Sequence, residues 1–86
     1  MENMVFTNCT LCFIYTIEIF DEWLIITEEV EDSYKDPFTH WFYPKSELKK
    51  ILNSISLEEF VGAFNKDPRK VFSILKDNKI HAKYVL

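Results

Sequence analysis

The chain of 86 residues is long enough for one domain with a modest core, and residues 1–86 are expected to fold as a single domain. Apolar residues make up 48% of the chain and aromatic residues 16%, which excludes a disordered protein, and the single glycine excludes a glycine-rich phosphate loop. The net charge of −4 is unevenly distributed, because residues 1–43 hold nine acids and one base whereas residues 44–86 hold nine bases and five acids.

The apolar N-terminal stretch predicts neither a secretory leader nor a membrane span. Glu2 precedes it and no base does, and Glu18 and Asp21 interrupt it before the ~20 residues that a span needs. We therefore expect a protein of the cytoplasm, or of the host cell interior if a phage or virus encodes it, with no contact to membranes.

The N-terminal half predicts strands. Residues 1–8 have no clear pattern, whereas residues 9–19 alternate between two faces and predict one strand with a strongly apolar side. Asp21-Glu22 predicts a turn, residues 23–30 a return strand, residues 31–37 a polar loop and residues 38–43 a short aromatic strand.

Cys9 and Cys12 form a CxxC pair inside the strand predicted over residues 9–19. Positions three apart in a strand point to opposite faces, so the two thiols are expected to be structural. There is no second CxxC, and His40 and His81 stand alone, so we expect no metal site and no cofactor.

The C-terminal half predicts three short helices and a last strand. Pro44 suits the first turn of a helix that ends near Asn53. Ser56 with Glu59 has the spacing of a capping box, and Asp67-Pro68 marks another helix start. Residues 80–86 alternate and predict a strand that joins the sheet at an edge, where it would also allow a homodimer.

Strands followed by helices predict an α+β fold. It comprises an N-terminal antiparallel β-meander of about three strands, three short helices and a C-terminal strand that returns to the sheet. We find no catalytic constellation of side chains and expect a protein that is not an enzyme.

The acidic N-terminal half suggests a protein-binding regulator or inhibitor, of the kind represented by phage anti-defence proteins, immunity proteins and antitoxins. Carboxylates around exposed aromatic rings would dock onto a basic partner protein, including one that normally binds nucleic acid. The expected contact residues are Glu18, Asp21, Glu22, Trp23, Glu28, Glu29, Glu31, Asp32, Asp36, Trp41 and Tyr43.

The stretch from residue 56 to residue 75 supports an alternative function. Its tight connection predicts either a helical hairpin or a helix-turn-helix corner. It is similar to the helix-turn-helix segments of DNA-binding proteins at Ser56, Leu57, Phe60, Phe64, Pro68, Val71, Ile74 and Leu75. This resemblance implies a DNA-binding regulator whose second helix, within residues 67–77, contacts DNA through Arg69, Lys70, Ser73 and Lys76.

Overall fold

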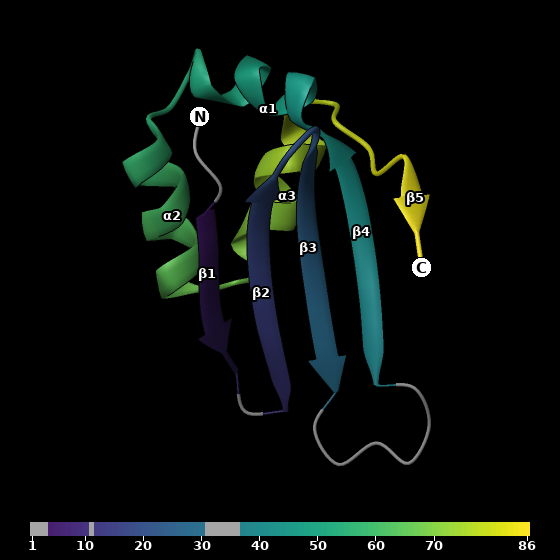
Figure 1. Ribbon diagram of the computed structural model, residues 1–86. Helices are drawn as coiled ribbons and strands as arrows, with labels where there is room; N and C mark the ends of the chain where they lie inside the picture. The colour runs from purple at the N-terminus through teal and green to yellow at the C-terminus, as the bar shows by residue number, and fades with distance from the viewer. Residues whose placement is uncertain (1–3, 11, 31–36) are drawn as a thin grey trace.

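The computed structural model describes residues 4–10, 12–30 and 37–86 of the chain. Over these residues the fold is α+β, as predicted, with three helices on one face of a five-stranded antiparallel sheet (Figure 1). The strands are β1 (Met4–Cys9), β2 (Phe13–Phe20), β3 (Trp23–Val30), β4 (Phe38–Pro44) and β5 (Tyr84–Val85), and the helices are α1 (Lys45–Leu52), α2 (Leu57–Lys66) and α3 (Lys70–Asp77).

The sheet follows the order of the chain, β1-β2-β3-β4-β5, so the N-terminal meander has four strands and not three. The prediction of one strand over residues 9–19 was wrong, because β1 and β2 are separate strands that pair with each other. The amide of Thr10 donates to the carbonyl of Phe13 at 2.8 Å and closes the turn between them. Residues 10–13 contain no Gly, Pro, Asn or Asp, so no residue type there predicts a turn.

The core lies between the sheet and the helices. Alternate residues of β2 and β3 face the helices and are almost fully buried, as required of a sheet that is covered on one side. The buried apolar residues are Tyr15, Ile17, Ile19, Leu24, Ile26, Tyr43, Leu48, Ile51, Phe60, Phe64, Val71, Leu75 and Ile80.

Two of the predicted local signals are confirmed. Asp21 and Glu22 form the turn between β2 and β3, and Asp21 has a positive φ of 53°, which Asp tolerates better than most residues. Ser56 caps α2, since its Oγ accepts a hydrogen bond from the Glu59 amide at 3.1 Å. The same hydroxyl donates to Glu59 Oε1 at 3.3 Å.

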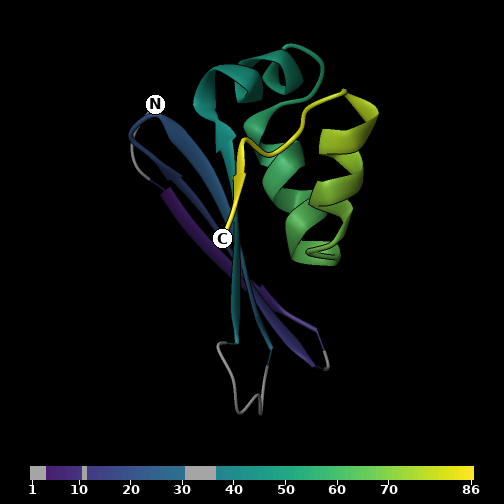
Figure 2. The ribbon, with the colours of Figure 1, turned by 90° about the vertical axis from the view of Figure 1, so that its right-hand side faces the viewer.

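The helix predicted to start at Asp67-Pro68 begins slightly later, at Lys70. The Asp67 side chain accepts a hydrogen bond from the Arg69 amide, and its carbonyl accepts one from the Lys70 amide. A tight turn over residues 67–69 therefore precedes α3. The helices α2 and α3 lie side by side and antiparallel, so they form a helical hairpin and not a helix-turn-helix corner (Figure 2).

The last strand is shorter than predicted. Ile80 is buried in the core, and only residues 84–85 are assigned to β5. The backbones of Leu86 and His40 exchange two hydrogen bonds, at 2.8 and 2.9 Å, so the end of the chain extends the pairing of β5 with β4.

Gly62 lies in the interior of α2, and a Cβ atom added to it would meet no atom within 4 Å. Glycine weakens a helix interior, so Gly62→Ala is expected to raise the free energy of unfolding by about 0.5–1 kcal/mol. Urea denaturation followed by circular dichroism would measure this. A lower midpoint for the variant would contradict the open space beside Gly62.

Candidate functional site

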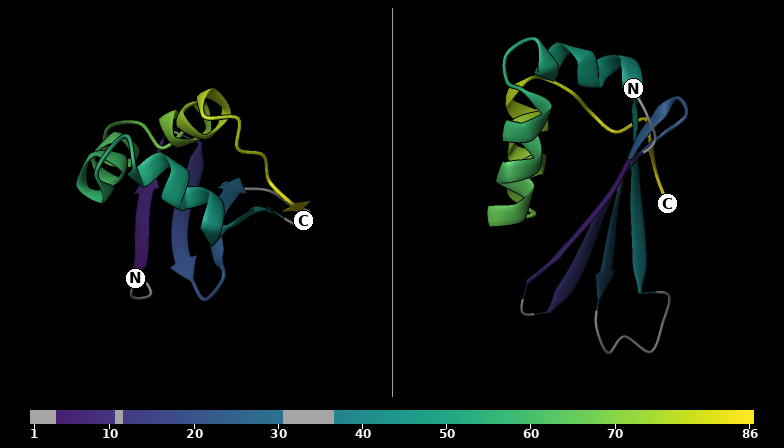
Figure 3. Two further views of the ribbon diagram at one scale, coloured as in Figure 1. Left: turned by 90° about the horizontal axis from the view of Figure 1, so that it is seen from above. Right: turned by 60° about the vertical axis from the view of Figure 1, so that its left-hand side comes forward.

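The most distinctive surface is the face of the sheet that the helices leave uncovered, here called the open face (Figure 2, Figure 3). Along each strand, its residues alternate with the buried ones. Several large apolar side chains of the open face are exposed, among them Val5, Phe20, Phe38 and Tyr84. Contiguous exposed apolar surfaces are common at sites where proteins bind partners, and this face is therefore the candidate site.

Five rings on the open face form a continuous aromatic patch, which comprises Trp23, Phe38, His40, Phe42 and Tyr84. Trp23 lies 5.9 Å from Phe42 and 5.6 Å from Tyr84, measured between ring centroids. His40 stacks on Phe38 at 6.1 Å and lies 6.4 Å from Phe42. Thr27 Oγ1 lies 2.9 Å from His40 Nδ1 and fixes the imidazole. The rings of the patch come from strands β3, β4 and β5.

Two carboxylates border this patch. Glu18 lies directly opposite Ile25, whose other neighbour is Phe42, and Glu29 lies directly opposite Phe38. Within the described part of the chain, neither carboxylate forms an ion pair.

The negative charge of Asp21 and Glu22 is partly balanced within the molecule. These two turn residues line a hollow together with Lys45 and Lys49 of α1. Lys83 is a further base beside the patch, with its ammonium 5.7 Å from the centroid of the Tyr84 ring. Among the described acidic residues of the open face and the β2–β3 turn, Glu18 and Glu29 have no lysine lining the same hollow.

Three predicted contact residues lie on the other face of the sheet. Tyr43 is 5% exposed and belongs to the core, so its selection as a contact residue was wrong. Trp41 is half-buried and packs edge-on against Phe72 of α3 at 4.9 Å. Glu28 is half-buried on the same side. The remaining predicted residues, Glu31, Asp32 and Asp36, lie outside the described residues.

Glu28 belongs to a polar cluster between the sheet and the start of α3. The buried Tyr15 hydroxyl donates to Glu28 Oε2 at 2.7 Å, and Arg69 Nε donates to the same hydroxyl at 2.9 Å. The Arg69 guanidinium also lies 4.9 Å from the centroid of the Phe13 ring. The hydrogen bond to Tyr15 raises the pKa of Arg69. The cluster ties the start of α3 to β2 and β3.

Burial raises the pKa of the Tyr15 phenol, with a smaller opposing effect from the Arg69 hydrogen bond, and burial also raises the pKa of Tyr43. The pKa of each phenol is higher in the folded state than its unfolded value of 10.0. The two protonated phenols therefore contribute their full share of the free energy of unfolding below pH 10, and this share is lost as the pH rises through their folded-state pKa. Thermal unfolding from pH 8 to pH 12 should show this loss, and Tyr15→Phe should reduce it. A melting temperature constant over this range would contradict the burial of both phenols.

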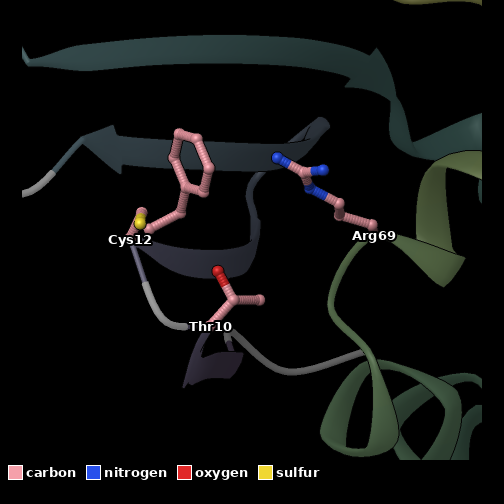
Figure 4. A pocket seen from close by; sticks show the side chains of 4 residues that line it. Thr10, Cys12 and Arg69 are labelled. Atoms are coloured by element: carbon pink, nitrogen blue, oxygen red, sulfur yellow. The ribbon is translucent and has the colours of Figure 1, made fainter.

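The two cysteines flank the β1–β2 turn and are free thiols. Cys9 lies opposite Ile14 on the open face, whereas Cys12 lines a hollow on the helix side with Thr10, Phe13 and Arg69 (Figure 4). The two cysteines were predicted to lie in one strand and to be buried structural thiols, but they lie on either side of a turn and both are exposed. In the described ranges, no three His, Cys, Asp or Glu side chains gather as metal ligands.

The residues of the DNA-binding alternative do not share one outward face. Lys70, Ser73 and Lys76 are exposed on α3. Arg69 precedes the helix and its guanidinium is directed at Tyr15 and Phe13 of the sheet.

The sequence interpretation missed Phe38, His40, Phe42 and Tyr84. The alternation of residues 38–43 separates this strand into Phe38, His40 and Phe42 on one face and Trp41 and Tyr43 on the other. This alternation of side chains between two faces can be seen in the sequence alone. Which of the two sets faces the helices depends on the pairing of Tyr43 with buried Leu24, which the sequence does not specify.

Comparisons of the chain with family models, with curated proteins and with solved structures give no match. No helix of the described ranges has the length and apolar character that a membrane span requires.

Proposed function

We propose that this chain is a small protein-binding regulator or inhibitor, without enzymatic activity, that docks its open face onto a basic surface of a partner protein. The aromatic patch carries this proposal, because five neighbouring rings stand on a sheet face that no helix of the chain covers. Aromatic residues are enriched at protein interfaces and provide most of their binding free energy.

The charge on the open face indicates the chemistry of the partner. Glu18 and Glu29 border the patch without an ion pair to a described residue, and the net charge of the chain is −4. Lysine or arginine side chains around an apolar centre would complement this arrangement, and opposite charge speeds the encounter. A basic groove that normally holds nucleic acid has this chemistry.

Capture of partners from the native host, followed by mass spectrometry, tests the proposal. The wild-type chain should retain a basic protein, and Glu18→Lys and Glu29→Lys should each lose it while keeping the wild-type circular dichroism spectrum. Asp77→Lys is the matched control, because it makes the same charge change at the exposed end of α3 and is expected to retain the partner.

Retention of the same partner by both charge-reversed variants would contradict docking through the open face. Equal loss in the Asp77→Lys control would show that net charge, and not the open face, determines capture.

A further inference from the structure

The strand β1 forms one edge of the sheet and, among the described strands, pairs only with β2. Its residues, Met4–Cys9, include no charged residue and no proline, and the register with β2 runs without a bulge. Charges, prolines and bulges are the usual means by which proteins protect an edge strand. This edge carries none of them and is therefore suited to pair with another strand.

The pairing of β1 with β2 determines which backbone groups face outward. The amide of Thr10 donates to the carbonyl of Phe13, so Thr10 and Phe13 are a hydrogen-bonded residue pair of the ladder. Hydrogen-bonded and non-hydrogen-bonded pairs alternate along an antiparallel ladder. The N–H and C=O groups of Val5, Thr7 and Cys9 therefore point away from β2, toward the free edge.

An apolar groove lies beside this edge on the helix side. It has a volume of about 310 Å³ and is lined by Phe6, Leu57, Glu58, Val61, Gly62 and Asn65. An apolar cavity of about 150 Å³ holds a benzene-sized group. Gly62 keeps the groove open, since no atom lies within 4 Å of the position that a Cβ would take.

The helix α2 lies alongside β1 with its N-terminal turn toward Met4 (Figure 1). The Asn8 side chain fixes the C-terminal end of α2 to β1, because it donates to the carbonyls of Phe64 and Asn65 at 3.0 and 2.9 Å. Glu58 therefore stands at the Met4 end of the groove. It forms no ion pair with a described residue.

We propose that β1 and α2 accept an extended segment of another protein as a sixth strand of the sheet. The backbone of the segment pairs with Val5, Thr7 and Cys9, one aliphatic side chain opposite Phe6 enters the groove, and a basic side chain two residues further along lies near Glu58. This is recognition by strand addition, in which the backbone provides affinity and alternate side chains provide specificity.

A second copy of this chain fits the site less well. Its own β1 strand would bring no base to Glu58, because Met4–Cys9 is uncharged.

A fluorescein-labelled peptide with both ends capped, Thr-Val-Thr-Leu-Thr-Lys-Thr, probes this site by fluorescence anisotropy. In antiparallel pairing, leucine lies opposite Phe6 and lysine lies toward Glu58. We expect saturable binding that slows hydrogen exchange of the Val5, Thr7 and Cys9 amides. The same peptide N-methylated at the amides that pair with β1 should not bind.

Two protein variants test the groove itself. Gly62→Leu fills it and should weaken binding about tenfold or more, whereas Ser73→Leu, which adds the same side chain on exposed α3, should leave binding unchanged. Glu58→Lys should weaken binding of the lysine peptide and restore binding of a glutamate peptide.

Each possible failure has a distinct result. Absence of binding, or binding indifferent to N-methylation and to Gly62→Leu, would overturn the proposal. Sedimentation could show that the wild-type chain is a dimer and that the Gly62→Leu variant is not. This result would assign the β1 edge to a second copy of the chain and would also overturn the proposal. The aromatic patch takes no part in these measurements, so their outcome is separate from that of the proposed function.

Discussion

Phe64→Ala is expected to lower the free energy of unfolding by about 3–5 kcal/mol, the usual loss for a fully buried phenylalanine. Phe64 is 0% exposed and lies in α2, at the centre of the layer between the helices and the sheet. Small domains have a total stability of about 5–15 kcal/mol, so this loss would leave a substantial unfolded fraction under mild denaturant. Urea denaturation followed by tryptophan fluorescence measures the change.

Phe20→Ala is the matched control, because it removes the same side chain from the open face, where Phe20 is 51% exposed. Phe20→Ala should lower the free energy of unfolding by less than about 1 kcal/mol. Comparable losses for the two variants would mean that Phe20 is covered in solution, and would contradict the description of this face as open.

Tyr84→Ala is expected to weaken binding of the captured partner about 30-fold or more, the effect of losing a hot-spot aromatic residue. Tyr84 is 49% exposed, which makes it the most accessible ring of the patch, and its ring contacts both Trp23 and Phe42. Titration calorimetry with the partner measures the change in Kd.

Tyr84→Phe keeps the ring and should retain most of the affinity, which separates the contribution of the ring from that of the hydroxyl. The stability of Tyr84→Ala should fall by less than about 1 kcal/mol, because β5 has only two residues and lies at an edge of the sheet. Unchanged affinity in Tyr84→Ala would remove the aromatic patch from the interface.

Most of the secondary structure followed from local patterns. The return strand predicted over residues 23–30 has the observed bounds, and the spacing of Ser56 and Glu59 predicted the start of α2. These signals are reliable because each depends on a hydrogen bond or a side-chain period within a few residues. The turn over residues 10–13 was missed because its residue types are equally compatible with a continuing strand.

The candidate site was less predictable, because it depends on register. Trp23, Glu18 and Glu29 were expected at the surface and lie on the open face, but Tyr43 and Trp41 were assigned to the same surface and face the helices. A change of one residue in register exchanges the two faces of a strand. The position of Tyr84 beside Trp23 requires contact between residues 61 positions apart, which no local pattern reveals.

The DNA-binding alternative depended on the same kind of long-range information. The sequence from residue 56 to residue 75 is compatible with a helical hairpin and with a helix-turn-helix corner. The packing of both helices on the sheet, through Phe60, Phe64, Val71 and Leu75, holds them antiparallel. The hydrogen bond from Arg69 to Tyr15 then directs this guanidinium to the sheet.

The order of the strands also determines how the chain reaches this structure. Each of the first four strands pairs with its neighbour in sequence, so most of the ladder can form by successive closure of short loops. Only β5 is separated from its partner strand β4 by the three helices, so we expect these two strands to pair last. Folding rates rise as contacts become more local, so we expect folding within milliseconds, with the C-terminal residues ordering last.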